Sequence, residues 1–298
     1  MKKNNLILAA VLVVLIGLGF AYNGPIKNWR EKANQPKNFL SDVDFGKIDK
    51  VEIAKGKTVL AKQGEDWKVG TDKKAFNASP SAIEQMIAQL KAVQQGSLEL
   101  VSTNKDRKPE FQTDDSGIEV TFSQGDNKTT VIIGKMTSDY SSSYISRQDD
   151  DNTYRTAANL WSVFMAEEWR NLAIFTGDSA KAQKIRLQFS DKQYILEKKG
   201  EDWFDGKTKL NKDKVNNILT RMTSLAAAKI PAQDFKPTGL AKASLIVQLT
   251  GDGLDNTLMI GKDDGQGQFY AKRGDNDLIY LIAKVDKDEL AKKPDQLK

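Results

Sequence analysis

Three short motifs occur twice in this chain, in the same order. The distance from each motif to its counterpart falls from 136 through 127 to 126 residues, as expected for a duplicated unit whose second copy has lost a few loop residues. A repeat of this length predicts two domain-sized copies rather than a solenoid. The pairs are Gly64-Glu65-Asp66-Trp67 with Gly200-Glu201-Asp202-Trp203, Ile133-Gly134-Lys135 with Ile260-Gly261-Lys262, and Tyr144-x-x-Arg147 with Tyr270-x-x-Arg273.

Each copy contains one segment with the period of an amphipathic helix. Its apolar residues recur three or four positions apart, so they share one face that must be buried against another element. Ser79 before Pro80 is a favourable N-cap in the first copy, and Asn211 takes that position in the second. The two apolar stripes are Ile83, Met86, Ile87, Leu90 and Val93, and Val215, Ile218, Leu219, Met222 and Leu225.

Alternating apolar and polar residues predict short strands on both sides of each helix, as in Ile118–Phe122 and Leu245–Leu249. The glycine of each Ile-Gly-Lys motif is expected to end a strand. A short helix over residues 159–169 is expected to close the first copy, with residues 285–291 as its counterpart. The predicted fold class is α+β, with two tandem repeats that each combine a mostly antiparallel sheet and one amphipathic helix.

The run from Leu6 to Tyr22 has no charged residue and follows Lys2 and Lys3. Its length is at the lower limit for crossing a bilayer, so we interpret it as an N-terminal transmembrane helix that anchors the chain. A cleaved signal peptide is the alternative, because Gly19-Phe20-Ala21 provides small residues before a cleavage point. Both interpretations export the rest of the chain, and we expect the amino terminus inside and the bulk outside the cytoplasm.

The expected organisation has four parts: a membrane anchor over residues 1–22, a linker over 23–46, a first α+β repeat over 47–180 and a second over 181–298. The part after the anchor is long enough for two hydrophobic cores.

The composition excludes several classes of chemistry. The chain has no cysteine and no histidine, which removes disulfides, cysteine nucleophiles, Ser-His-Asp triads and the usual zinc sites. A net charge of +5, spread over many residues of both signs, is weak support for a nucleic-acid partner, and none is expected. We therefore expect a non-catalytic protein without cofactor, catalytic residues or metal.

The conspicuous residues of the repeated motifs have a structural and a functional interpretation. Trp67 and Trp203 are expected to pack against the helices, with a ligand platform as the alternative. In a strand, the odd spacing of Tyr-x-x-Arg sends the two side chains to opposite faces, which suits an arginine at a sheet margin paired with a carboxylate. The possible ligand or partner surface comprises Tyr144, Arg147, Tyr270, Arg273, Trp67 and Trp203.

Acidic residues offer two further hypotheses. The turns at 149–152 and 263–265 lack the spacing and terminal glutamate of a calcium loop, and are interpreted as solvated turns. A carboxylate-based hydrolase would need two converging acids with perturbed pKa, drawn from Glu119, Asp139, Asp149 and Asp275.

The order of these motifs resembles the bacterial family called domain of unknown function 4340 (DUF4340). The resemblance covers roughly residues 47–290 in two copies, with Gly64 and Trp67, the capped helix 79–93, the Tyr-x-x-Arg strand, Phe235 to Leu240 and Trp169 to Phe175 as its carriers. Residues 113–118 depart from the Pro-Thr-Gly-Leu form of residues 237–240. The resemblance implies a single-pass protein of the bacterial inner membrane, facing the periplasm and associated with ABC-type transport systems.

Three functional classes follow from these observations. The first is a membrane-anchored accessory or scaffold protein of an envelope system, with ABC-type transporter components as partners. The second is an extracytoplasmic module that binds a glycan, peptide or lipid in a lined cleft. The third is the carboxylate-based hydrolase.

Overall fold

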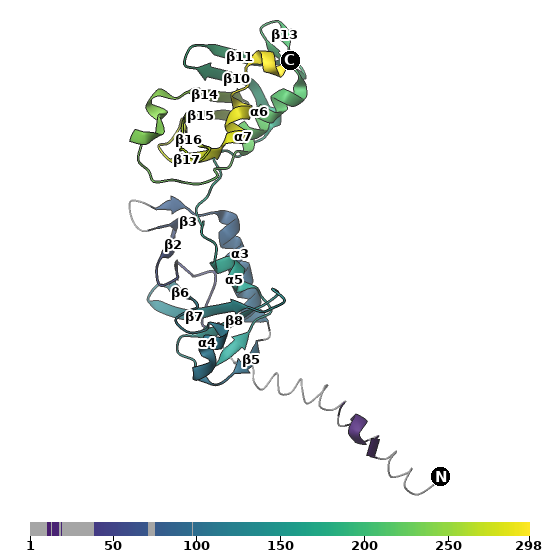
Figure 1. Ribbon diagram of the computed structural model, residues 1–298, viewed down its shortest axis with the longest axis vertical. Coiled ribbons are helices and arrows are strands. Elements are labelled where there is room, and N and C mark those ends of the chain that lie inside the picture. The colour runs from purple at the N-terminus through teal and green to yellow at the C-terminus, as the bar shows by residue number, and fades with distance from the viewer. Residues whose placement is uncertain (1–10, 13, 18, 20–38, 71–74, 97) are drawn as a thin grey trace, which may run out of the picture. The chain divides into compact units, whose positions relative to one another are not determined.

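The computed structural model describes residues 11–12, 14–17, 19, 39–70, 75–96 and 98–298. The chain divides into two compact units, Met1–Asn171 and Leu172–Lys298. In each unit the strands form an antiparallel sheet and helices pack against it (Figure 1). The α+β class and the antiparallel sheets expected from the sequence are therefore confirmed.

The first unit contains a nine-stranded sheet in the order β4-β3-β2-β1-β6-β7-β8-β9-β5. Its strands are β1 (Lys50–Ile53), β2 (Thr58–Gln63), β3 (Asp66–Val69), β4 (Phe76–Asn77), β5 (Glu99–Ser102), β6 (Ile118–Gln124), β7 (Asn127–Met136), β8 (Ser143–Arg147) and β9 (Thr153–Arg155). Its helices are α3 (Pro80–Gln95), α4 (Lys108–Phe111) and α5 (Leu160–Phe164).

The second unit contains an eight-stranded sheet in the order β13-β12-β11-β10-β14-β15-β16-β17. Its strands are β10 (Ala182–Phe189), β11 (Gln193–Lys199), β12 (Asp202–Asp205), β13 (Thr208–Lys209), β14 (Leu245–Gly251), β15 (Leu254–Asp263), β16 (Gln268–Arg273) and β17 (Ile279–Ala283). Its helices are α6 (Lys212–Ser224) and α7 (Lys284–Leu290), and the 3-10 turns η5 (Lys236–Thr238) and η6 (Leu240–Lys242) precede β14.

The strand orders show that the two units share one topology. The order β4-β3-β2-β1-β6-β7-β8-β9 in the first sheet corresponds strand for strand to the whole second sheet. The extra strand β5 pairs with β9, and in the second unit only an isolated bridge, Lys229 to Leu281 of β17, marks that place. Trp67 and Trp203 are each the second residue of an equivalent strand, opposite Lys62 and Lys198.

The long helix of each unit begins at the expected cap and buries the expected face. The Ser79 side chain accepts a hydrogen bond from the Ala82 amide, and Asn211 accepts from Asp213 and Lys214. The equivalent residues Leu90 and Met222 are completely buried. This apolar contact between helix and sheet forms the core of each unit.

The units meet earlier in the sequence than the expected boundary after residue 180. Ile174 and Phe175, assigned to the first repeat in the prediction, belong to the second unit. The amides of both residues donate hydrogen bonds to the Leu225 carbonyl, at 2.8 and 3.1 Å. Their tertiary hydrogen bonds therefore place these residues with the unit that follows them.

The glycines of the two Ile-Gly-Lys motifs lie inside strands, which corrects the expectation that they end them. β7 and β15 continue past Gly134 and Gly261, and each has an irregular register at that point. A Cβ at Gly134 would lie 2.3 Å from the Phe111 carbonyl oxygen, and one at Gly261 would lie 2.1 Å from that of Thr238. Glycine is required because another backbone segment packs directly on the bulge.

The sequence comparison places residues 113–118, which depart from the Pro-Thr-Gly-Leu form, at the position of that motif, and this packing shows that the true counterpart begins before residue 113. Phe111 and Thr238 occupy the same place over the bulge, so Gln112 is the counterpart of Gly239. Both residues have left-handed backbone conformations, with φ of 55° and 71°. The first copy therefore keeps the backbone turn with a different residue.

The helix expected over residues 159–169 is shorter than predicted and ends at Phe164. Downstream of it the chain becomes extended, because Arg170 forms a bridge with Ala78 and the Ser79 amide donates to the Trp169 carbonyl. This pairing with the residues before α3 competes with a longer helix.

The expected anchor from Leu6 to Tyr22 lies mostly outside the described residues. Among the residues that the structure does describe, no helix has the length and apolar character needed to cross a membrane.

The two repeated tryptophans differ in burial. Trp203 is 2% exposed, whereas Trp67 is half-buried at the margin of its core. We expect Trp203→Ala to lower the free energy of unfolding of the second unit by about 3 to 5 kcal/mol, and Trp67→Ala to have a smaller effect on the first. Thermal and urea unfolding of both variants measures the difference. Equal losses of unfolding free energy in the two variants would contradict the conclusion that, of the two tryptophans, Trp203 is the fully buried one.

Candidate functional site

Arg147 is the last residue of β8 and connects three parts of the first unit. Its Nη1 donates to the Phe39 carbonyl at 3.2 Å and to Asp42 Oδ1 at 3.1 Å, and its Nε donates to Asp149 Oδ1 at 3.1 Å. Thr129 also donates to Asp42, at 3.0 Å. Arg147 therefore holds the segment that precedes β1 against the sheet margin.

Arg273 performs the same structural task in the second unit. Its Nη1 donates to the Ile174 carbonyl at 2.7 Å, its Nε donates to Asp275 at 2.8 Å, and its guanidinium lies 5.1 Å from the centre of the Phe175 ring. Each arginine thus pairs with the carboxylate two residues later. Each also donates to a backbone carbonyl of the lead-in segment, which is the stretch of chain that precedes the first strand of its sheet. The carboxylate pairing suggested by the Tyr-x-x-Arg spacing is present in both copies.

The other predicted site residues do not join these arginines. Tyr144 is on the opposite face of the first sheet, where its ring centre lies 4.9 Å from that of Phe111. Tyr270 faces the corresponding side of the second sheet, opposite Leu281. Trp67 and Trp203 face the cores. Within each unit, the tyrosine, the arginine and the tryptophan therefore have separate structural environments.

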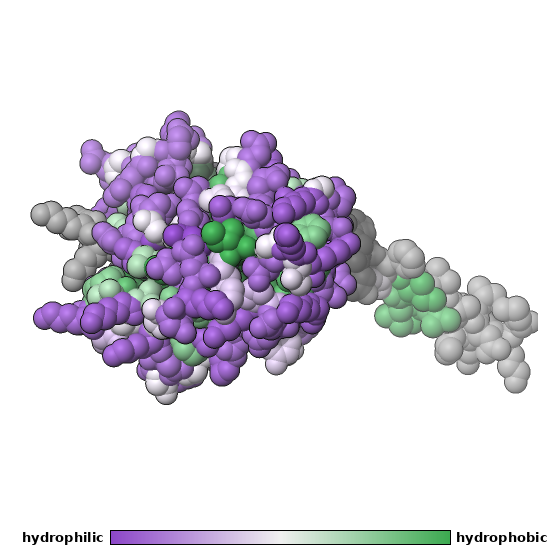
Figure 2. Space-filling view, turned by 90° about the horizontal axis from the view of Figure 1, so that it is seen from above, coloured by the Kyte–Doolittle hydropathy of each residue, from purple (hydrophilic) through white to green (hydrophobic). Residues whose placement is uncertain are grey.

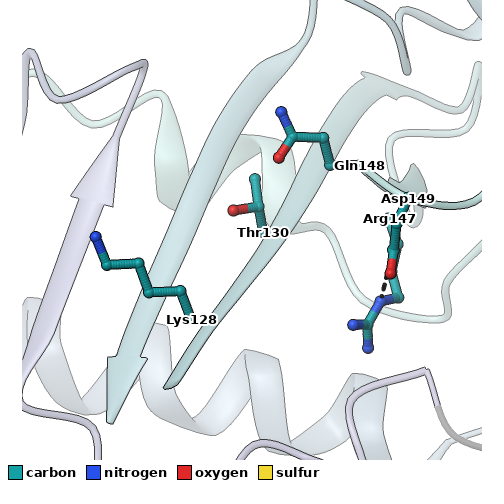
Figure 3. Close-up of a pocket in the computed structure, with 5 residues that line it drawn as sticks. All are labelled: Lys128, Thr130, Arg147, Gln148 and Asp149. Carbon is teal, nitrogen blue, oxygen red and sulfur yellow. Dashed lines mark hydrogen bonds and ion pairs between the residues drawn. The ribbon is translucent and has the colours of Figure 1, made fainter. Parts of the chain in front are cut away.

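Arg147 instead contributes to a hollow that sequence reasoning did not find. The hollow has a volume of about 360 Å³ and is lined by Lys128, Thr130, Arg147, Gln148 and Asp149. Figure 3 shows Lys128 and Thr130 along one strand, Gln148 beside Thr130, and Arg147 bonded to Asp149 at the other side. The strand is β7, and the Gln148 amide donates to the Thr130 carbonyl at 3.2 Å, which fixes the floor of the hollow.

The equivalent place in the second unit has some of the same residues as this hollow and some different ones. Thr257, Arg273 and Asp275 are the counterparts of Thr130, Arg147 and Asp149, so these residue types serve the shared fold. Asp255 stands in place of Lys128, and Gly274 in place of Gln148. A Cβ at Gly274 would lie 2.9 Å from the Thr257 Cβ. A side chain such as that of Gln148 therefore does not fit at this position of the second unit.

Lys128 and Gln148 are consequently the residues that make the hollow specific to the first copy. Within the described part of the chain, the Lys128 ammonium has no hydrogen bond or ion pair, and it is exposed. The hollow thus offers one unpaired cation beside amide and hydroxyl groups. Comparing the two copies position by position, rather than seeking shared motifs, was the sequence signal for these residues.

Two of the acidic residues proposed for hydrolysis, Asp139 and Asp275, have a lowered pKa. Hydrogen bonds from Thr137 and then Ser141 lower the pKa of Asp139 to about 2, and the hydrogen bond from Arg273 lowers the pKa of Asp275. A general acid needs a raised pKa to keep its proton near neutral pH. Asp139 and Asp149 lie beyond opposite ends of β8, and Asp275 is in the other unit.

A metal site gains no support either. Among the described residues, no three acidic side chains gather closely enough to hold a metal ion.

The architecture defines a class of protein, a tandem duplicate of an antiparallel sheet packed against a capped helix. Each copy has one clamping arginine, Arg147 or Arg273, that holds the segment before the sheet.

The chain belongs to the family described as domain of unknown function (DUF4340), which it matches over residues 67–231 and 204–298. The two overlapping matches confirm the resemblance inferred from the motifs. No curated protein and no solved structure matches the chain.

The contact between Asp42 and Arg147 should make stability depend on pH. Burial acts to raise the pKa of Asp42, but hydrogen bonds from Arg147 and Thr129 outweigh it and leave the pKa below its ordinary value. A lowered pKa in the folded state gives stability that is complete above the unfolded value near 3.9 and is lost as the pH falls through the folded value. We expect Asp42→Asn to melt lower than wild type at pH 7.

Melting curves between pH 7 and pH 3 measure this effect. The difference in melting temperature between wild type and Asp42→Asn should shrink as the pH falls below about 4. A constant difference across that range would contradict the role of the Asp42 carboxylate.

The residues of the hollow should separate into structural and non-structural groups. We expect Lys128→Ala to leave the melting temperature nearly unchanged, because the exposed ammonium has no partner within the described residues. Arg147→Ala should lower the free energy of unfolding of the first unit by about 1 to 3 kcal/mol, because it removes one donor from each of the Phe39 carbonyl, Asp42 and Asp149. Differential scanning calorimetry measures both, and a loss for Lys128→Ala as large as that for Arg147→Ala would refute the division.

Proposed function

We propose that this chain is a membrane-anchored extracytoplasmic accessory or scaffold protein of a bacterial envelope system, auxiliary to an ABC-type transporter and without catalytic activity. Its anchor is the segment from Leu6 to Tyr22, in the inner membrane, and the two α+β units lie in the periplasm.

The observation that supports this proposal most strongly is the exposed apolar surface of the N-terminal segment. The described residues 11–12, 14–17 and 19 are helical, and Val11, Leu12 and Ile16 are 53%, 59% and 58% exposed. They appear as a green group in Figure 2, whereas the globular surface in that view is largely hydrophilic. Contiguous exposed aliphatic side chains are unfavourable in water and favourable in lipid.

The two units support the scaffold role by what their charged groups do. Arg147 and Arg273 hold structural segments, and the carboxylates with shifted pKa are stabilised in the ionised form. These arrangements suit two rigid modules that present surfaces. The proposal of an ABC-type partner rests on the resemblance to the family. It does not rest on any contact within the chain.

Cell fractionation tests the anchor. The full-length protein should sediment with membranes and remain there after carbonate extraction, and a reporter fused after residue 40 should register an extracytoplasmic position. The matched control is a chain that lacks residues 1–22, which should be soluble. A full-length chain extracted by carbonate would refute the anchor, and a mature protein that begins at Tyr22 would establish a cleaved signal peptide instead.

Affinity purification tests the accessory role. Transporter components should co-purify with the detergent-solubilised full-length protein and be identified by mass spectrometry. Their absence under conditions in which the bait stays folded would argue against the transporter assignment.

A ligand-binding module is the second candidate, and the hollow beside Lys128 is the observation that favours it. The unpaired ammonium and the Gln148 side-chain amide offer hydrogen-bond donors to a small polar or anionic group, and the Thr130 hydroxyl, which shares a hydrogen bond of 2.9 Å with that of Thr121, lies beside them. A glycan, peptide or lipid headgroup bound there should lose affinity in Lys128→Ala while the protein remains folded.

A further inference from the structure

Arg186 occupies the middle of β10 on the face of the second sheet opposite α6. Its neighbours Ile185 and Leu187 are completely buried in the core, so the alternation of a strand turns Arg186 to the other face. This open face is defined here by Arg186, Gln188, Ile195, Ile246, Gln248 and Met259, which share it through the strand registers.

The guanidinium of Arg186 lacks a partner. Its Nε atom is buried and makes no hydrogen bond, and no hydrogen bond or ion pair of the whole side chain exists within the described part of the chain. Lys184, two residues earlier on the same face, is paired with Glu197 at 3.8 Å. The side chain of Arg186 as a whole is half-buried, so its outer N–H groups can be reached from outside the chain, and an acceptor brought by a partner would satisfy them.

The equivalent position of the first unit carries a charge that is paired within the chain. Glu52 is the counterpart of Arg186, because each stands between equivalent neighbours on both adjoining strands. Lys50 pairs with Glu52 at 3.0 Å, so this position is neutralised within the first unit. The second copy has reversed the charge and left it unpaired.

The side chains around Arg186 indicate what kind of acceptor fits. Ile195, directly opposite on β11, is 37% exposed, and Ile246 pairs with Met259 across β14 and β15 as half-buried residues. Methionine and arginine are enriched at protein interfaces, and the centre of an interface is more apolar than the rest of the surface. A guanidinium fork matches a carboxylate, which accepts two parallel hydrogen bonds.

We propose that this open face docks an acidic protein segment, which places a carboxylate on Arg186 and aliphatic side chains on Ile195, Ile246 and Met259. The inference rests on the proposed scaffold function and names the chemistry of its partner. It is independent of the membrane anchor, because the docking face lies entirely within the second unit.

Peptide binding to the full-length protein in detergent tests this assignment. The probe is a short fluorescein-labelled peptide that combines leucine with glutamate, and its control carries glutamine in place of glutamate. We expect saturable binding of the glutamate peptide by fluorescence anisotropy, weaker binding of the glutamine peptide, and a loss of about tenfold or more in Arg186→Gln. Glu52→Gln, at the equivalent position of the first sheet, should bind as wild type does.

Stability separates a docking role from a structural one. Arg186→Gln should melt at the wild-type temperature, since the guanidinium has no partner to lose, whereas Arg273→Gln should melt several degrees lower. Failure of the glutamate peptide to bind, equal binding by the glutamine peptide, or unchanged affinity in Arg186→Gln would each overturn the proposal. Displacement of the peptide by inorganic phosphate alone would replace the docking face with a simple anion site.

Discussion

Every other feature of this protein depends on one contact: an amphipathic helix laid on one face of an antiparallel sheet. Leu90 in α3 and Met222 in α6 are fully buried in that contact. A sheet whose first face is covered in this way keeps a second face for solvent or partners. The arrangement therefore decides at once where the core lies, which strand positions are structural and which remain available for function.

Because the unit is duplicated, equivalent positions of the two copies can be compared within one chain. Residues with the same task in both copies, such as the glycines under the strand bulges and the clamping arginines, maintain the shared fold. Two residues at positions where the copies differ in charge, Lys128 and Arg186, have no ion pair or side-chain hydrogen bond within the described residues. These two residues mark the places proposed for a ligand and for a partner.

The clamping arginines also show why a conspicuous motif need not be a functional site. Both Tyr-x-x-Arg motifs are candidates for a binding surface on sequence grounds. In the structure, however, each arginine donates hydrogen bonds to a neighbouring carboxylate and to a carbonyl of the lead-in segment. An arginine held by several internal partners has fewer N–H groups left for a ligand. The guanidinium of Arg186, outside every repeated motif, makes no hydrogen bond or ion pair within the described residues.

The sequence by itself determined the duplication, the α+β class and the capped helices, because the period of apolar residues and the capping residues act locally. Tertiary structure alone decided that Gly134 and Gly261 lie within strands, that α5 ends at Phe164, and that Ile174 and Phe175 join the second unit. Those outcomes depend on backbone segments that approach from distant parts of the chain. The hollow beside Lys128 and the unpaired Arg186 have the same origin, since only the folded arrangement shows which charged groups find a partner and which do not.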